Sequence, residues 1–209
     1  MIDDEKLSTK EMIVNSAMTL FAEKGFTETT IRELAADVGL NSASIYHHFP
    51  SKTSILEFVL EDYVKNIANT FYQDRLATLT ADLTADDILS CLMLVFPEGR
   101  VDYYINVLRV ILQEQFRNPF VREIMSDHMI LGGERVVTAI INYLIDKKVL
   151  KEDTDPDFWA KSHSSLIYAF SGRTALGIGD QEPGYSGLGM VEMLRNLFDL
   201  MLKTCKTGR

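Results

Sequence analysis

The chain contains four histidines and two cysteines, the side chains best suited to metal binding or nucleophilic chemistry. His47 and His48 are adjacent and would point about 100° apart on a helix, so they cannot chelate one ion as an i, i+4 pair would. Cys91 and Cys205 are far apart in sequence, and neither has a histidine nearby. The glycine-rich run 184–189 matches neither G-x-S-x-G nor G-x-G-x-x-G. These patterns predict no catalytic residue, no metal site and no cofactor.

Polar and aromatic side chains of another kind are concentrated between residues 42 and 48. At about 100° per residue in a helix, Ile45 and Phe49 fall on one face and must point toward a core. The outward and flanking positions carry small, hydroxyl, phenol and imidazole groups: Ala43, Ser44, Tyr46 and His47. Such groups suit contacts to nucleic-acid grooves and phosphates, whereas an ordinary surface helix would carry more Lys and Glu. The stretch therefore predicts a helix that contacts double-stranded DNA.

The elements that must position this stretch are also helical. An apolar helical period ends at Gly25, and Thr30 opens a short helix through the capping box S/T-x-x-E with Glu33. Pro50 ends the helix at 42–49, and Ser51 caps a long fourth helix. Helices of about seven residues are unstable alone in water, so the two short ones must pack on a longer helix. This arrangement predicts a helix-turn-helix, whose second short helix enters the major groove.

The rest of the chain shows the same helical period. Further helices are expected at about 84–96, 100–117, 119–147, 155–176 and 187–204, with Gly132-Gly133 weakening or kinking the third of these. No segment alternates with the period of two that a strand requires, so the fold class is all-α. We expect a helix-turn-helix DNA-binding domain at 1–52, a connecting helix at 52–78 and a larger helical domain at 79–209.

A set of residues at fixed spacing resembles the N-terminal domain of TetR-type transcriptional regulators over about residues 8–60. It consists of Leu20-Phe21, Gly25-Phe26, Thr29-Thr30-Ile31, Leu34-Ala35, Gly39, Ser44-Ile45-Tyr46-His47-His48-Phe49 and Ser51-Lys52. The resemblance implies a dimeric repressor that a small molecule releases from a palindromic operator. Together with the outward face above, it implies DNA contacts by Thr29, Thr30, Ser42, Ala43, Ser44, Tyr46, His47 and Lys52.

The resemblance also implies a small-molecule effector inside the C-terminal domain and a homodimer formed by the last two helices. Candidate pocket residues are Tyr103, Tyr104, Arg109, Phe116, His128 and His163. The alternative for the first four is an ordinary amphipathic helix with one salt bridge, and for the two histidines a packed or solvent-bonded role. Candidate interface residues are Trp159, Ile167, Phe170, Leu194 and Phe198, with core packing as the alternative for those on the penultimate helix.

The charge balance argues in the opposite direction. The 209 residues carry 21 basic and 30 acidic side chains, a net charge of −9, and residues 1–58 hold five basic and nine acidic ones. Phosphate binding draws on Lys and Arg, so a helical small-molecule-binding protein with weak or lost DNA binding is one alternative, and a regulator that needs a co-repressor is another. An N-terminus without a signal-peptide pattern, and no apolar run near the roughly 20 residues of a membrane span, predict a cytoplasmic protein without membrane contact.

Overall fold

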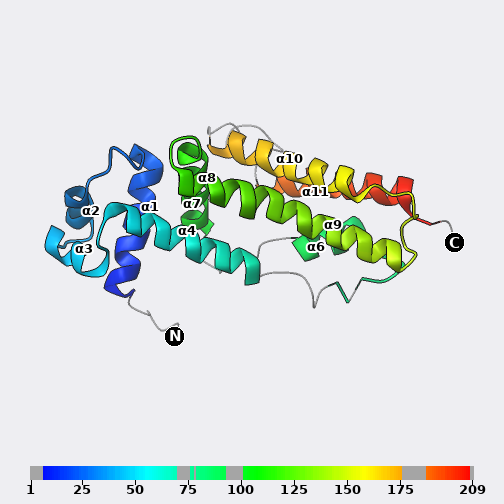
Figure 1. The fold of residues 1–209 in the computed structure, drawn as a ribbon, viewed down its shortest axis with the longest axis horizontal. Helices are drawn as coiled ribbons and strands as arrows, with labels where there is room; N and C mark the ends of the chain where they lie inside the picture. Colours follow the sequence, from blue (N-terminus) through cyan, green and yellow to red (C-terminus); the bar gives the residue numbers. More distant parts are fainter. Residues whose placement is uncertain (1–6, 70–75, 78, 93–100, 176–186, 208–209) are drawn as a thin grey trace. The chain divides into compact units, whose positions relative to one another are not determined.

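The computed structural model describes residues 7–69, 76–77, 79–92, 101–175 and 187–207, and nearly all of its regular structure is helical (Figure 1). Within these residues no strand forms, and one isolated bridge pairs Leu150 with Lys206. The all-α fold class is therefore confirmed. The described residues form two compact units, one of them made of residues up to Asn66 with those of Phe96–Ile124, the other of Ile67–Val95 with Met125–Arg209.

The N-terminal unit begins with the helices that the sequence predicts: α1 (Thr9–Lys24), α2 (Ile31–Asp37), α3 (Ser42–His48) and α4 (Lys52–Asn69). Each of these four helices begins at a side-chain cap, because a hydroxyl or amide oxygen accepts a hydrogen bond from an otherwise unpaired N–H of the first turn. The cap of α4 is Ser51, as the sequence predicts. The Ser16 hydroxyl of α1 donates to the Asp37 carboxylate of α2. Gly39 has a φ of +68° in the turn between α2 and α3, a conformation that side chains with a Cβ disfavour.

Two further helices belong to this unit, α7 (Val101–Glu114) and α8 (Pro119–Glu123). The sequence predicts one separate domain at 79–209, and the packing differs because α7 and α8 belong to the N-terminal unit. The reason is that α7 packs against α1, where the Gln113 side-chain amide donates to the Ala22 carbonyl oxygen at 3.1 Å. The Tyr63 ring of α4 also lies beside Tyr104 of α7, with ring centroids 6.0 Å apart.

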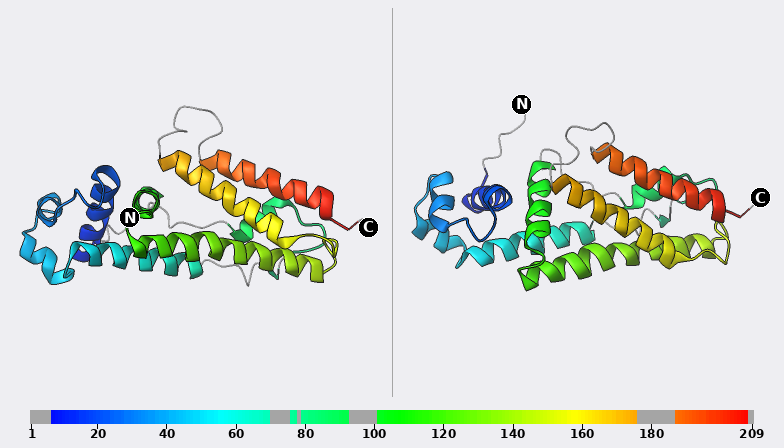
Figure 2. Two further views of the ribbon diagram at one scale, coloured as in Figure 1. Left: turned by 45° about the horizontal axis from the view of Figure 1, so that its top comes forward. Right: turned by 90° about the horizontal axis from the view of Figure 1, so that it is seen from above.

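The second unit contains α6 (Ala85–Leu92), a π-helical segment (Ile124–Ile130, which begins at the last residue of the first unit), α9 (Leu131–Asp146), α10 (Pro156–Ala175) and α11 (Gly187–Cys205). Both views in Figure 2 show α10 and α11 side by side. The expected continuous helix at 119–147 is irregular at the π-helical segment, and Gly132-Gly133 lie in the first turn of α9. The Arg135 guanidinium donates to the Asp127 carbonyl oxygen at 2.9 Å across this irregular part.

Candidate nucleic-acid interface

The faces of α3 follow the prediction. Ile45 is fully buried and Phe49, which caps the helix, is nearly so, because both pack into the core of the N-terminal unit. On the opposite face, the side chains of Ala43 and His47 are exposed, and Tyr46 is 53% exposed. The helix thus presents a phenol and an imidazole to solvent, both able to donate or accept hydrogen bonds with nucleic acid.

Asn41 fixes where α3 begins. Its side-chain oxygen accepts a hydrogen bond from the Ser44 backbone N–H at 2.9 Å and another from the Ser44 hydroxyl at 3.2 Å. Ser42 and Ser44 are half-buried at this end of the helix. The cap holds the first turn, which carries three of the predicted DNA contacts, against fraying.

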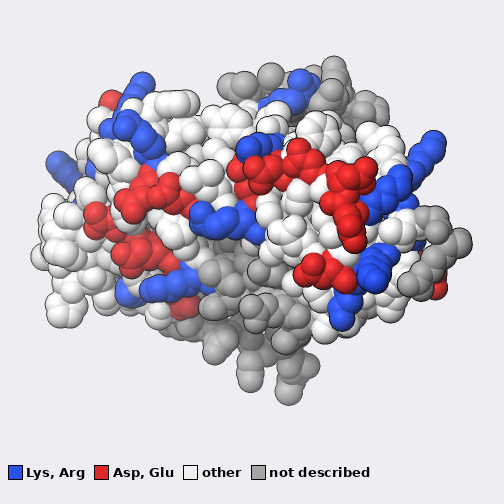
Figure 3. All heavy atoms as spheres, turned by 45° about the vertical axis from the view of Figure 1, so that its right-hand side comes forward, with Lys and Arg blue, Asp and Glu red and all other residues white. Residues whose placement is uncertain are grey.

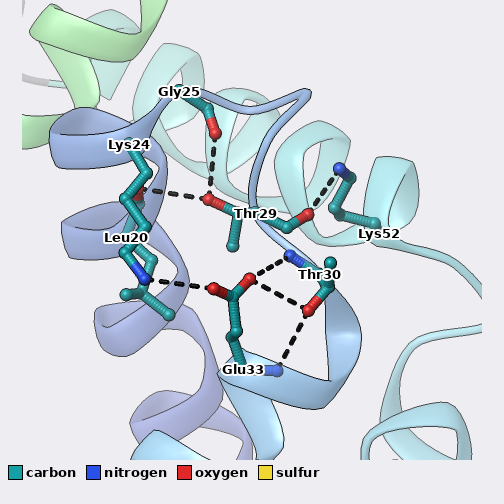
Figure 4. A network of polar contacts seen from close by, with 7 residues as sticks. All are labelled: Leu20, Lys24, Gly25, Thr29, Thr30, Glu33 and Lys52. Atoms are coloured by element: carbon teal, nitrogen blue, oxygen red, sulfur yellow. Dashed lines mark hydrogen bonds and ion pairs between the residues drawn. The ribbon is translucent and has the colours of Figure 1, made fainter.

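The start of α2 is held by a network of charged and hydroxyl groups (Figure 4). Glu33 accepts hydrogen bonds from the Thr30 N–H and hydroxyl, each at 2.9 Å, while the Glu33 N–H donates to the Thr30 hydroxyl oxygen. Lys24 of α1 pairs with the same carboxylate at 3.1 Å. The Thr30 N–H contributes most, followed by Lys24, to holding the pKa of Glu33 at about 2, well below its usual value. Thr30 is exposed, and its place among the DNA contacts stays a prediction.

Thr29 has a different role from the predicted phosphate contact. Its side chain is 1% exposed, and its hydroxyl donates to the Gly25 and Leu20 carbonyl oxygens at 2.9 and 3.2 Å (Figure 4). A buried hydroxyl that is already used inside the protein cannot reach a phosphate. We therefore correct the assignment: Thr29 closes the connection between α1 and α2. Thr29 is buried whereas the next residue, Thr30, is exposed, because the chain turns into α2 at Thr30.

Lys52, the first residue of α4, is also engaged within the protein. Its Nζ donates to the carbonyl oxygens of Phe26, Thr27 and Thr29 at 2.5, 3.1 and 2.6 Å. It also lies 4.6 Å from the centroid of the Phe26 ring. Desolvation is the largest influence on this ammonium and lowers the pKa of Lys52 from its usual value.

Among the described residues, the other cations of the helix-turn-helix part are also engaged by neighbouring side chains, with one exception. Lys10 lies 3.7 Å from the ring centroid of Phe58, and Lys24 pairs with Glu33. Arg32, in the first turn of α2, is exposed, and its side chain forms no hydrogen bond or ion pair with another residue that the structure describes. Arg32 is not among the predicted DNA contacts, although an arginine two residues after a capping threonine, in the first turn of a helix, is a recognisable signal. Acidic side chains are interspersed with basic ones over the face drawn in Figure 3.

The candidate pocket residues are distributed over both units. Tyr104 is buried beside Tyr63, and Arg109 is a half-buried guanidinium without an ion-pair partner in the described part of the chain. Phe116 is 74% exposed in the turn that follows α7, so it does not line a pocket wall. His128 is exposed on the π-helical segment and is corrected in the same way. Both were assigned from residue type, which carries no information on depth.

Two other pocket candidates can be placed individually. Tyr103 is half-buried on α7 and contacts Tyr104 edge to face, with ring centroids 5.3 Å apart. His163 is buried in the second unit, 5.9 Å from the Phe198 ring centroid, and its Nδ1 has no hydrogen-bond partner among the described residues. Burial lowers the pKa of His163 from 6.5 to about 4.

The candidate interface residues form the protomer's own core instead. Four are buried: Trp159, Phe170, Leu194 and Phe198. Ile167 is half-buried and packs on the same core. An apolar stripe at helical spacing predicts burial but does not say against which surface, and here these residues lie inside one chain. Among the residues of α10 and α11 whose burial is described, the exposed large apolar side chains are those of Phe158, Tyr168, Met193 and Leu200.

Among the described residues, no cluster of three or more His, Cys, Asp or Glu side chains could hold a metal ion. None of the described helices combines the length and apolar character needed to cross a membrane.

Two short helices joined by a glycine turn, with a capped and outward-facing second helix, define a helix-turn-helix protein. The model of the family "Bacterial regulatory proteins, tetR family" matches residues 13–59. The similarity to this family therefore lies in the helix-turn-helix part of the chain.

Two curated relatives that resemble part of the chain are named as transcriptional regulators. The HTH-type transcriptional repressor KstR2 of Mycolicibacterium smegmatis is 38% identical over 76 residues, 36% of this chain and 37% of that protein. The IcaR negative transcriptional regulator of the icaADBC biofilm operon in Staphylococcus aureus is 44% identical over 61 residues, 28% of this chain and 33% of that protein. The chain thus matches about a third of the length of these curated relatives.

One solved structure shows that the likeness in fold extends over the whole chain. It is that of a transcriptional regulator from Saccharomonospora viridis in complex with choline, with a TM-score of 0.65 and 24% identity. The alignment covers 95% of this chain and 98% of that one. At this identity the likeness concerns the fold.

Proposed function

We propose that the protein is a DNA-binding transcriptional regulator, a dimeric repressor that a small molecule releases from a palindromic operator. The observation that carries the proposal is the outward face of α3, where Tyr46 and His47 are exposed while Ile45 is fully buried. A helix anchored on one side and polar on the other can enter the major groove without disturbing its own packing. The relatives, which are named as transcriptional regulators, favour this role over an enzymatic one.

The same proposal includes a homodimer formed through α10 and α11. Phe158 and Tyr168 of α10 and Met193 and Leu200 of α11 are large apolar side chains exposed on two adjacent helices. A second copy of the chain would cover them in a four-helix bundle. The two DNA-binding heads, each made of α1, α2, α3 and the start of α4, would then be related by a two-fold axis. Two small exposed residues of α10, Ser165 before Tyr168 and Ala169 directly after it, would let the partner helix approach closely.

The effector part of the proposal rests on the tyrosines and arginine of α7. Arg109 is half-buried without an ion-pair partner among the described residues, so it could orient an anionic ligand beside Tyr103. The choline complex of the Saccharomonospora viridis regulator supports a small-molecule site in this fold. Arg109→Ala should weaken the response to an anionic effector, and an unchanged dose response would remove this residue from the site.

Selection of bound duplexes from a random library, read by sequencing at low and near-physiological salt, tests the proposal. An enriched palindrome is expected for the wild type, and Tyr46→Ala/His47→Ala should abolish enrichment with an unchanged circular dichroism spectrum. His128→Ala, an exposed histidine outside the head, is the matched control and should select the same palindrome. Absence of enrichment for the wild type at either salt, or unchanged selection by the double variant, would contradict the proposal.

A second candidate is a helical small-molecule-binding protein with weak or lost DNA binding. The engagement of Lys10, Lys24 and Lys52 within the protein favours it, because those cations are not free to neutralise phosphates. Ligand-induced stabilisation of a protein that selects no duplex, with or without the ligand, would support this second candidate. Selection that appears only with ligand present would indicate a co-repressor instead.

A further inference from the structure

We propose that Lys52 is a positioning residue of the DNA-binding head: it holds the connection between α1 and α2 in place rather than neutralising a phosphate. This inference rests on the proposed function. The role differs from the phosphate contact that the sequence predicts for Lys52.

The geometry at the ammonium carries the inference. A lysine ammonium has three N–H donors, and three carbonyl oxygens lie at hydrogen-bonding distance from Nζ, those of Phe26 at 2.5 Å, Thr27 at 3.1 Å and Thr29 at 2.6 Å. The Phe26 ring, with its centroid 4.6 Å away, covers another side of the charge. An ammonium in this setting has no N–H left for a DNA phosphate.

The carbonyls belong to the residues that lead into α2. Thr30, directly after Thr29, caps that helix, and α2 packs against α3. Lys52 therefore ties the first turn of α4 to the chain segment that sets where α2 begins. Without this tie, the connection would keep the Thr29 hydroxyl bonds and the Thr29 N–H bond to the Gly25 carbonyl at 3.3 Å, all of which lie within α1 and the connection itself.

A third helix carries a charge that acts on Lys52. Glu114, the last residue of α7, is 5% exposed. Burial is the largest influence and lowers the pKa of Lys52, while the Glu114 carboxylate is the largest of the charges that raise it. The start of α4, the end of α7 and the α1–α2 connection thus all act on one ammonium.

The test measures the salt dependence of DNA binding, using a duplex from the selection experiment. Lys52→Met removes the charge and the donors while keeping a long apolar side chain. We expect its affinity to fall about tenfold or more, because several charge-assisted hydrogen bonds are lost. We also expect the slope of log K against log salt, between about 50 and about 200 mM, to match the wild type. A slope reduced by about 0.9 for each head would show a phosphate contact and overturn the proposal.

Three variants calibrate this result. Arg32→Met removes the exposed cation of α2 and is expected to reduce the slope, which shows that the assay detects a lost phosphate contact. Lys65→Met removes an exposed charge further along α4 and should change neither quantity. Lys52→Arg keeps the charge, but the N–H groups of a planar guanidinium cannot all point to three converging carbonyl oxygens. We therefore expect Lys52→Arg to bind DNA as weakly as Lys52→Met. Full rescue by Arg would overturn the positioning role.

Hydrogen exchange provides a readout that does not depend on DNA. The Thr29 amide should exchange faster in Lys52→Met than in the wild type or Lys65→Met, because the connection has lost its tie to α4. Unchanged exchange at Thr29 would overturn the inference. A wild type that selects no duplex would overturn the proposed function, and the positioning role in DNA binding with it. The exchange comparison would still decide whether Lys52 holds the connection.

Discussion

Replacing His163 by leucine should remove a large part of the protein's sensitivity to acid. The imidazole is buried in the second unit, and burial alone lowers its pKa from 6.5 to about 4. The folded protein therefore binds this proton less readily than the unfolded chain does. The contribution of neutral His163 to the free energy of unfolding is complete above about pH 6.5 and is lost as the pH falls toward about 4. The difference between the two pKa values corresponds to about 3 kcal/mol of unfolding free energy.

Urea unfolding followed by circular dichroism at about pH 7.5 and about pH 4.5 would measure this difference. Protein concentration should be held constant, because the proposed dimer would add its own free energy of association. At the higher pH we expect His163→Leu to lie within about 1 kcal/mol of the wild type, because it removes a buried Nδ1 without a described partner. At the lower pH it should be the more stable protein by about 2–3 kcal/mol. His128→Gln, which alters an exposed histidine, should follow the wild type. Equal loss of stability in His163→Leu and wild type would refute the reasoning.

Four further predictions concern the same structure. Thr30→Ala should lower the unfolding free energy by about 1 kcal/mol through loss of the α2 cap, with Thr53→Ala, exposed on α4, as the neutral control in urea unfolding. Gly39→Ala should cost about 1–2 kcal/mol from backbone strain, because φ is +68° and no atom lies within 4 Å of an added Cβ; a stability equal to the wild type would contradict this. Glu33 contributes stability that is present above about pH 4.5 and lost toward about pH 2, so acid titration of Glu33→Gln should be flatter over that range. Phe198→Ala should cost about 3–5 kcal/mol, measured by urea unfolding, since the ring is fully buried in one chain; a change only in dimer dissociation would indicate an interface residue instead.

The local features of the head could be predicted from the sequence because they depend on neighbours in the chain. The capping box of Thr30 and Glu33, the cap at Asn41 and the buried side of α3 all follow from spacings of three or four residues. The same holds for the other described helices: the sequence predicts their order, and it predicts most of their ends to within a few residues. The pair Gly132-Gly133 predicts an irregular helix between residues 119 and 147. The irregularity is present, but it lies before the glycine pair, in the π-helical segment Ile124–Ile130.

Only the tertiary structure decided which surface each side chain meets. The apolar spacing of Trp159, Phe170 and Phe198 predicts burial equally well in a dimer interface or in a core, and the packing of α10 on α9 and α11 places them in the core. Lys52 looks like a free cation in the sequence, because the carbonyls that surround it lie more than twenty residues earlier in the chain. Helical periodicity is a property of consecutive residues, whereas the partner of a helix face or of a charge depends on how distant segments pack. The sequence by itself therefore determined the helices and the outward face of α3, and the packing determined the roles of Thr29, Lys52 and the aromatic core.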